Sequence, residues 1–257
     1  MIPRWRARST RVISAREQMS LTLLRQHIEA VWGVRLPALA PGDQDALPDA
    51  PPDTDGAEDD AVPGWALYWA ETAHGAVRVW RPDVSADRRA ALLAHASADW
   101  ARGGDASGAG EVRHEVALAL AAPATLTEAA AGRVARRLDA GDALSDDALI
   151  EQFDPGETAY YANPARAPVV GVVEGGILAC IAHSSRRTHE ACELGINTRP
   201  EARRRGFALA ATVLWTTGVQ AESLIPLYSA FAANTASLAL ARAAGYRPFA
   251  HALYLKA

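Results

Sequence analysis

Arg203-Arg204-Arg205-Gly206-Phe207-Ala208 lies between a strand-like segment, residues 194–198, and a run of helix-forming residues, 209–217. The run predicts a helix that ends at Gly218. The first turn of a helix has backbone N–H groups without partners and carries the positive end of the helix dipole, so it favours a phosphate. Gly206 lets the backbone approach such a group closely, and the three arginines supply positive charge. The stretch therefore predicts a site for a phosphate-bearing cofactor.

The spacing Arg203-x-x-Gly206-x-Ala208 resembles the acyl-CoA pyrophosphate loop of the GNAT N-acetyltransferase superfamily. The downstream residues continue the resemblance. Residues 225–231 look like the family's next strand, Asn234-x-x-Ser237-x-x-Leu240 like its next helix, and Ala244-Gly245-Tyr246 like its Gly-aromatic corner. The resemblance covers residues 159–257, about two-fifths of the chain. It implies a GNAT-like acyltransferase fold that uses acetyl-CoA.

Hydrophobic patterning predicts the same fold class. Paired glycines at 175–176 indicate a hairpin between strands 169–173 and 177–183, and a second hairpin is expected to connect to strand 193–197 through residues 185–188. Strands at 65–70, 76–80, 111–121 and 248–255 and helices at 21–33, 85–100, 126–138 and 146–153 are also expected. Antiparallel hairpins followed by strand–helix–strand–helix–strand predict an α+β fold. Its sheet would be mixed and mostly antiparallel, with flanking helices and a smaller N-terminal α/β region.

The chain is expected to have three segments. Residues 1–62 would hold a basic tail, a short helix and an acidic proline-rich linker; residues 63–145 an α+β region of open role; and residues 146–257 the acetyl-CoA-binding domain. The tail is interpreted as disordered or as preceding a true start at Met19, and the alternative is a nucleic-acid-binding arm. The linker has eight acidic residues, four prolines and no Lys or Arg between positions 41 and 60. It is interpreted as a flexible connection, and the alternative is an arm that attracts a cationic substrate. The N-terminal region could be a degenerate copy of the acyltransferase fold or an unrelated cap.

Composition limits the class of protein. A net charge of −4 argues against nucleic-acid binding by global charge, and no apolar run approaches the length of a membrane span. Arginines near the N-terminus are not followed by the apolar segment of a secretory signal. Cys180 and Cys192 are too few for a disulfide framework and lack metal-ligand spacing, so they are interpreted as small buried hydrophobic residues. A cytoplasmic protein without a metal is expected.

The resemblance assigns cofactor contacts. Backbone groups around Leu194 and Ile196 would orient the pantetheine arm and polarise the thioester carbonyl. The pyrophosphate would bind Arg203, Arg204, Arg205, Gly206, Phe207 and Ala208. Asn234 and Ser237 would line the other side of the pantetheine path, although Asn234 also fits a helix N-cap.

Glu193 is the candidate general base, because it precedes Leu194 on the strand beside the cofactor. The alternative is a structural carboxylate that pairs with Arg186, Arg187 or another base, or one that faces solvent. His183 and His189 flank the second hairpin and have suitable chemistry, but a surface or structural role is the simpler interpretation.

At the position where many family members have the general acid, this chain has a different residue. Many members have a tyrosine directly after the position of Leu240, and this chain has Ala241 there. Tyr228, on the strand that would border the cleft, is the candidate substitute. A thiolate can also leave without a strong acid, because the pKa of a free thiol is only about 8.5.

Two functions of different class follow. The first is an N-acetyltransferase that moves an acetyl group from acetyl-CoA to a primary amine, on a small molecule or on a protein. The second is a non-catalytic acyl-CoA-binding or sensor protein, which Ala241 favours. The sequence leaves open the acceptor amine and the oligomeric state.

Overall fold

The structure is a computed structural model that describes residues 15–42, 44–48, 64–101, 112–138 and 144–256. Most of the predicted basic tail, most of the acidic linker and the expected connection at 103–110 lie outside the described residues. The helices are α1 (Ala15–Trp32), α2 (Ala86–Ala101), α3 (Glu128–Ala131), α4 (Leu144–Phe153), α5 (Thr158–Ala162), α6 (Phe207–Ala221) and α7 (Thr235–Ala243), with 3-10 turns at Pro164–Arg166 and Pro200–Ala202.

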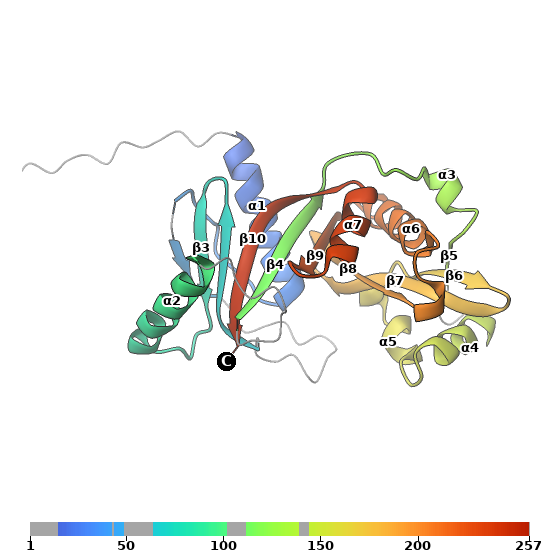
Figure 1. Ribbon diagram of the computed structural model, residues 1–257, viewed down its shortest axis with the longest axis horizontal. Helices are drawn as coiled ribbons and strands as arrows, with labels where there is room; N and C mark the ends of the chain where they lie inside the picture. Colours follow the sequence, from blue (N-terminus) through green and yellow to red (C-terminus); the bar gives the residue numbers. More distant parts are fainter. Residues whose placement is uncertain (1–14, 43, 49–63, 102–111, 139–143, 257) are drawn as a thin grey trace, which may run out of the picture.

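The strands of the described residues form one ten-stranded mixed sheet, which runs through the length of the molecule (Figure 1). They are β1 (Gln44–Ala46), β2 (Trp65–Thr72), β3 (Gly75–Trp80), β4 (Val112–Leu120), β5 (Arg136–Arg137), β6 (Val170–Glu174), β7 (Ile177–Arg187), β8 (Ala191–Thr198), β9 (Ile225–Phe231) and β10 (Tyr246–Lys256). The order across the sheet is β1-β3-β2-β10-β4-β9-β8-β7-β6-β5. The pairs β1–β3 and β8–β9 are parallel and the other seven are antiparallel, so the expected fold class is confirmed.

Strand β4 comes from the N-terminal part of the chain but lies between β9 and β10, which come from the C-terminal part. It pairs with β10 over nine residues of β4 and with β9 over residues Glu115 to Ala119. The boundary expected near residue 145 therefore separates segments whose strands interleave in one sheet.

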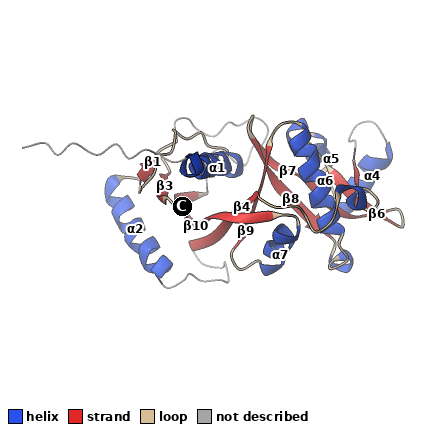
Figure 2. Cartoon of the chain, turned by 90° about the horizontal axis from the view of Figure 1, so that it is seen from above, coloured by secondary structure: helices blue, strands red, loops and turns tan. Residues whose placement is uncertain are grey.

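Helices α1 and α7 cover opposite faces of the sheet at β4 and β9 (Figure 2). Ala117 of β4 packs in the apolar cluster of α1, whereas its neighbours Val116 and Leu118 pack in the cluster that contains α6 and α7. This alternation follows from the two-residue period of a strand. The centre of the sheet is therefore covered on both sides.

Several expected elements differ from the structure. Residues 126–138 hold only the four-residue helix α3 and the short strand β5, not one helix. Helix α6 continues past Gly218 to Ala221, and β7 continues to Arg187, so the second hairpin turns after that residue. Helix α1 begins at Ala15, four residues before Met19. Within the expected acidic linker, residues 44–46 form β1.

Candidate functional site

Strands β8 and β9 start side by side and then stop pairing. Their parallel ladder joins Ala191 to Ile225, Cys192 to Pro226 and Glu193 to Leu227. Both strands continue beyond it, β8 to Thr198 and β9 to Phe231, without a further pair between them. We call the region between the unpaired parts of the two strands, residues 194–198 of β8 and 228–231 of β9, the strand opening. The backbone groups of Leu194 and Ile196 that would bond β9 in a closed sheet are left without that partner.

The arginine and glycine stretch connects the end of β8 to the start of α6. Gly206 is the N-cap of α6 with φ +82°, a left-handed conformation that glycine adopts without strain. Having no side chain, it leaves the N–H groups of the first turn without a side-chain cap. A Cβ built on Gly206 meets no atom within 4 Å, so the space beside the loop is open. These features fit a bound phosphate.

The three arginines of the loop have different environments. Arg205 forms an ion pair with Glu174 of β6, and its guanidinium stacks 4.7 Å from the centre of the Phe207 ring. Arg203 donates from Nε to the Thr198 carbonyl at 3.3 Å. Arg204 is exposed and adopts a positive φ of 61°. All three arginines are exposed, and contacts among the described residues occupy the guanidinium groups of Arg203 and Arg205, which favours Arg204 as a partner for an anion.

Helix α7 begins on the other side of the opening. The side chain of Asn234 accepts a bond from the Ser237 N–H at 3.0 Å, so Asn234 is the N-cap of α7. The hydroxyl of Tyr228 on β9 lies 2.8 Å from Ser237 Oγ. Ala241 is fully buried in the core cluster that also contains Tyr228. Burial raises the pKa of Tyr228, which is therefore a neutral hydroxyl at physiological pH.

Glu193, the last residue of β8 that pairs with β9, faces the opposite side of the sheet from Tyr228. Its side chain is 5% exposed, and its Oε2 lies 3.7 Å from Nδ1 of His27 on α1. Among the ion pairs of the described residues, the partner of Glu193 is thus His27. Among the residues that the structure describes, neither Glu193 Oε2 nor His27 Nδ1 has a hydrogen-bond partner, although both atoms are buried.

His27 is in turn held by Glu115 of β4. The Nε2 of His27 lies 3.0 Å from Glu115 Oε1, and the Tyr68 hydroxyl of β2 donates to the same oxygen at 3.1 Å. Burial lowers the pKa of His27, but the two flanking carboxylates outweigh it and raise this pKa to about 9. We call Glu115, His27 and Glu193 the buried array. Sequence reasoning missed His27 and Glu115, because no local motif marks either residue.

His183 and His189 are the two histidines considered as bases. His183 is the β7 ladder partner of Gly195, beside the strand opening. His183 is buried against Tyr160, whose hydroxyl lies 3.1 Å from His183 Nε2, and burial together with Arg166 lowers the pKa of His183 to about 4. His189 is exposed in the turn between β7 and β8. Cys180 and Cys192 are both buried and unpaired with each other, and burial raises the pKa of each thiol, as expected of structural cysteines.

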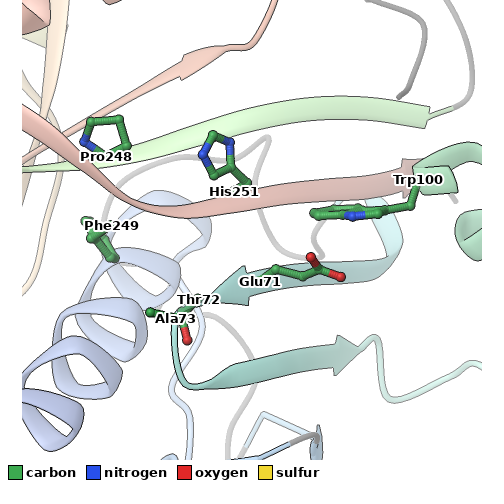
Figure 3. A pocket seen from close by; sticks show the side chains of 7 residues that line it. All are labelled: Glu71, Thr72, Ala73, Trp100, Pro248, Phe249 and His251. Atoms are coloured by element: carbon green, nitrogen blue, oxygen red, sulfur yellow. The ribbon is translucent and has the colours of Figure 1, made fainter. Parts of the chain in front are cut away.

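A separate pocket of about 330 Å³ lies where the β2–β3 turn, the end of α2 and β10 meet (Figure 3). Its lining residues are Glu71, Thr72, Ala73, Trp100, Pro248, Phe249 and His251. Strands β4 and β9 separate β10 from β8, so this pocket is distinct from the strand opening. Within the described residues no cluster of side chains fits a metal ion, and no helix is long and apolar enough to cross a bilayer.

Residues 149–251 match the family model described as GNAT acetyltransferase. No curated protein matches the chain. Among solved structures, a GNAT-family protein from Novosphingobium aromaticivorans is 24% identical over 57% of this chain and 66% of its own, with a TM-score of 0.44. A GNAT-family acetyltransferase from Colwellia psychrerythraea is 15% identical over 56% of each chain, also with a TM-score of 0.44. A GCN5-related N-acetyltransferase from Kribbella flavida is 15% identical over 92% of this chain and 94% of its own, with a TM-score of 0.42.

The chain therefore spans less than two thirds of the first two of these relatives. At these identities and TM-scores the likenesses say nothing about substrate. The match to the family model includes Glu193, the residues of the arginine and glycine loop, Tyr228 and Asn234, and it excludes His27 and Glu115.

Proposed function

From the premise that residues 149–251 form a GNAT acetyltransferase domain, we propose that the protein is an N-acetyltransferase that uses acetyl-CoA and a primary amine. The acceptor would be a small molecule. The observation that carries the proposal is the end of the β8–β9 ladder at Glu193 and Leu227, directly before the loop that leads to the Gly206-capped helix α6. This arrangement offers an extended, unpaired strand edge and a helix N-terminus in succession, which suits a long ligand with a phosphate group.

The proposed cofactor contacts follow the strand opening. Leu194 and Ile196 would bond the pantetheine arm through their backbone, in place of the missing strand partner. The pyrophosphate would lie at the N-terminus of α6, against the backbone of residues 205–208, with Arg203 and Arg204 as countercharges. Asn234 and Ser237 would border the arm from α7, and Asn234 would keep its role as N-cap.

When bound, acetyl-CoA would supply an acyl group activated as a thioester. Glu193 would accept the proton of the attacking amine as the new nitrogen–carbon bond forms. The carbon–sulfur bond would break, and Tyr228 would stabilise or protonate the leaving thiolate. Glu193 lies on the α1 side of the sheet and Tyr228 bonds to α7 on the other side. Acid and base would thus act from opposite sides of the strand opening.

The second candidate is an acyl-CoA-binding protein without catalysis. The observation that favours it is Ala241, which is buried and has no ionisable group, at the position where many members of the family that the sequence resembles have a tyrosine. In that case Tyr228 would serve only to anchor α7 through Ser237.

Isothermal calorimetry with acetyl-CoA, run beside a thiol-release assay on a panel of amines, distinguishes the two candidates. Binding with amine-dependent thiol release is expected. In Glu193→Gln, turnover should fall by about 100-fold or more while acetyl-CoA affinity stays within about twofold, since the change removes only the proton acceptor. Glu128→Gln, the same substitution at an exposed residue of α3, is the matched control. Binding without release would favour the sensor, and unchanged turnover in Glu193→Gln would remove Glu193 from the mechanism.

A further inference from the structure

The candidate base Glu193 is placed against a histidine that the GNAT domain match does not include. We propose that His27 of α1 is the positioning residue of Glu193: held by Glu115, the His27 ring orients the Glu193 carboxylate at the strand opening. This inference rests on the proposed function, because it explains how a buried carboxylate can serve as the base of that reaction.

The orientation of the His27 ring is fixed on several sides. Glu115 accepts at Nε2, and Tyr68 holds the same carboxylate oxygen in place. The ring of Phe249 on β10 meets the imidazole edge-on, with centroids 6.0 Å apart and planes at 86°. A carboxylate can only accept, so the Nε2 atom carries a proton, and Nδ1 is the atom that remains to face Glu193.

The two atoms that face each other, Glu193 Oε2 and His27 Nδ1, can each serve as the other's missing partner. Both atoms are buried, have no hydrogen-bond partner in the described part of the chain, and lie 3.7 Å apart. Buried polar atoms without partners are costly and rare in folded proteins. A proton on Nδ1 turns this contact into a charge attraction, and a small movement of either side chain would turn it into a hydrogen bond. Such bonds are often long before substrate binds.

The net charge of the buried array also indicates that His27 is protonated and interacts with Glu193. Two buried carboxylates without a cation would carry a charge of −2 away from water, and a protonated His27 reduces it to −1. The pKa of His27, which the carboxylates raise to about 9, makes it a cation at neutral pH. The hydroxyls that interact with the array are neutral at that pH: Tyr68 and Tyr254 near Glu115, and Tyr228 and Tyr246 near Glu193. On β7, the cation Arg186 is the ladder partner of Glu193, and His183, the ladder partner of Gly195, is neutral because burial and Arg166 lower its pKa to about 4.

A general base must be directed at the proton that it takes from the amine. The Glu193 carboxylate is buried, and its Oε2 lies 3.7 Å from His27 Nδ1, so the attraction to a charged His27 sets the direction of that carboxylate. Helix α1 would therefore belong to the reaction, although it lies outside the matched domain.

The first test measures the coupling without any acyl transfer. The imidazole of His27 is titrated by NMR in the full chain and in Glu193→Gln. We expect the wild-type ring to titrate near pH 9 and the variant at least about one pH unit lower, because one flanking negative charge is lost. A His27 that titrates near its ordinary value of about 6.5, or that does not respond to Glu193→Gln, would overturn the proposal.

The second test uses the amine that supports thiol release from acetyl-CoA. In His27→Gln we expect kcat to fall by about tenfold or more, with the KM for acetyl-CoA unchanged. The fall in activity that loss of the His27 proton causes near pH 9 should be absent from the pH profile of the variant. The same substitution at exposed His95 of α2 is the control and should change neither. In a Glu193→Gln background, His27→Gln should have little further effect. A folded His27→Gln protein with the wild-type pH profile would contradict the proposal.

The two levels of failure can be told apart. If no amine supports thiol release, the proposed function fails, and the NMR titration still decides whether His27 and Glu193 are coupled. If transfer occurs but His27 titrates independently of Glu193, the proposed function stands and the role of His27 is refuted. If His27→Gln does not fold, the titration of the wild type and of Glu193→Gln gives the result alone.

Discussion

Gly206 has two features that matter at the start of α6, its backbone conformation and the open space beside it, and one experiment can measure their effects separately. Its φ of +82° is strained for any other residue by about 1 kcal/mol, whereas the open space beside it is free for a ligand. Gly206→Glu should therefore cost a little stability and lower acetyl-CoA affinity by about 100-fold, roughly 2.7 kcal/mol, because it adds bulk and negative charge at the phosphate position. Calorimetry measures the affinity.

Gly156 provides the matched control for Gly206. It also has a positive φ, of 87°, and open space around its Cβ position, but it lies between α4 and α5. Gly156→Glu should show a similar loss of stability with unchanged acetyl-CoA affinity. If a folded Gly206→Glu protein binds acetyl-CoA as Gly156→Glu does, the loop is not the phosphate site.

His27 also makes a prediction about stability. Its folded pKa, about 9, lies above the unfolded value of about 6.5. The folded state therefore binds the extra proton, and this stabilisation is fully present below about pH 6.5 and is lost as the pH rises through about 9. The difference in free energy of unfolding between the wild type and His27→Gln should shrink over that range, as urea denaturation at several pH values would measure. A difference that is constant between pH 6 and pH 10 would contradict a charged His27.

Glu193 could be identified from the sequence, but its partners could not. Its candidacy follows from its place before Leu194 on a strand that leads to the cofactor loop. His27 and Glu115 are 88 residues apart in the chain and meet only because α1 packs on β4. An interaction that depends on tertiary packing leaves no spacing pattern in the sequence.

At the scale of elements, β8 depends on a glycine that no turn requires. A Cβ on Gly195 would lie 2.4 Å from Cε1 of His183 on the neighbouring strand β7. His183 is itself buried and bonded to Tyr160, so its ring has little room to move. Gly195→Ala should lower the free energy of unfolding by about 1–3 kcal/mol through overpacking. Urea denaturation measures this change, with Gly64→Ala as the control, since a Cβ on Gly64 meets no atom within 4 Å. Equal midpoints for the two variants would contradict the contact.

Most strands were predictable, whereas some boundaries were decided by packing. Gly218 was expected to end a helix, but it lies inside α6, where a Cβ would come within 2.8 Å of Pro168. Glycine is there for close approach and not for a helix end. Residues 126–138 have helical spacing, yet Arg136 and Arg137 form β5 by pairing with β6. In both cases a tertiary contact outweighs a local preference.

At the scale of the whole molecule, the mixed sheet and its parallel crossover followed from the order of elements along the chain. The position of β4 did not, because it depends on pairing between distant segments. Strand β10 pairs with β2 on one side and with β4 on the other, and β9 pairs with β4. The boundary near residue 145 that the sequence suggested therefore does not indicate which strands pair with each other.

The interleaved sheet makes a prediction about folding. A fragment of residues 144–257 contains the whole family match, but β9 and β10 would lose β4, and Glu193 would lose His27. Both strands would then expose long unpaired edges, which favour aggregation. We expect the fragment alone to show no cooperative unfolding and no acetyl-CoA binding, and coexpression with residues 1–143 to restore both. Circular dichroism melts and calorimetry of the fragment, the reconstituted pair and the full chain measure this. A fragment that folds and binds acetyl-CoA alone would show that β4 is dispensable, since the cofactor residues at the strand opening would then need only β8, β9, α6 and α7.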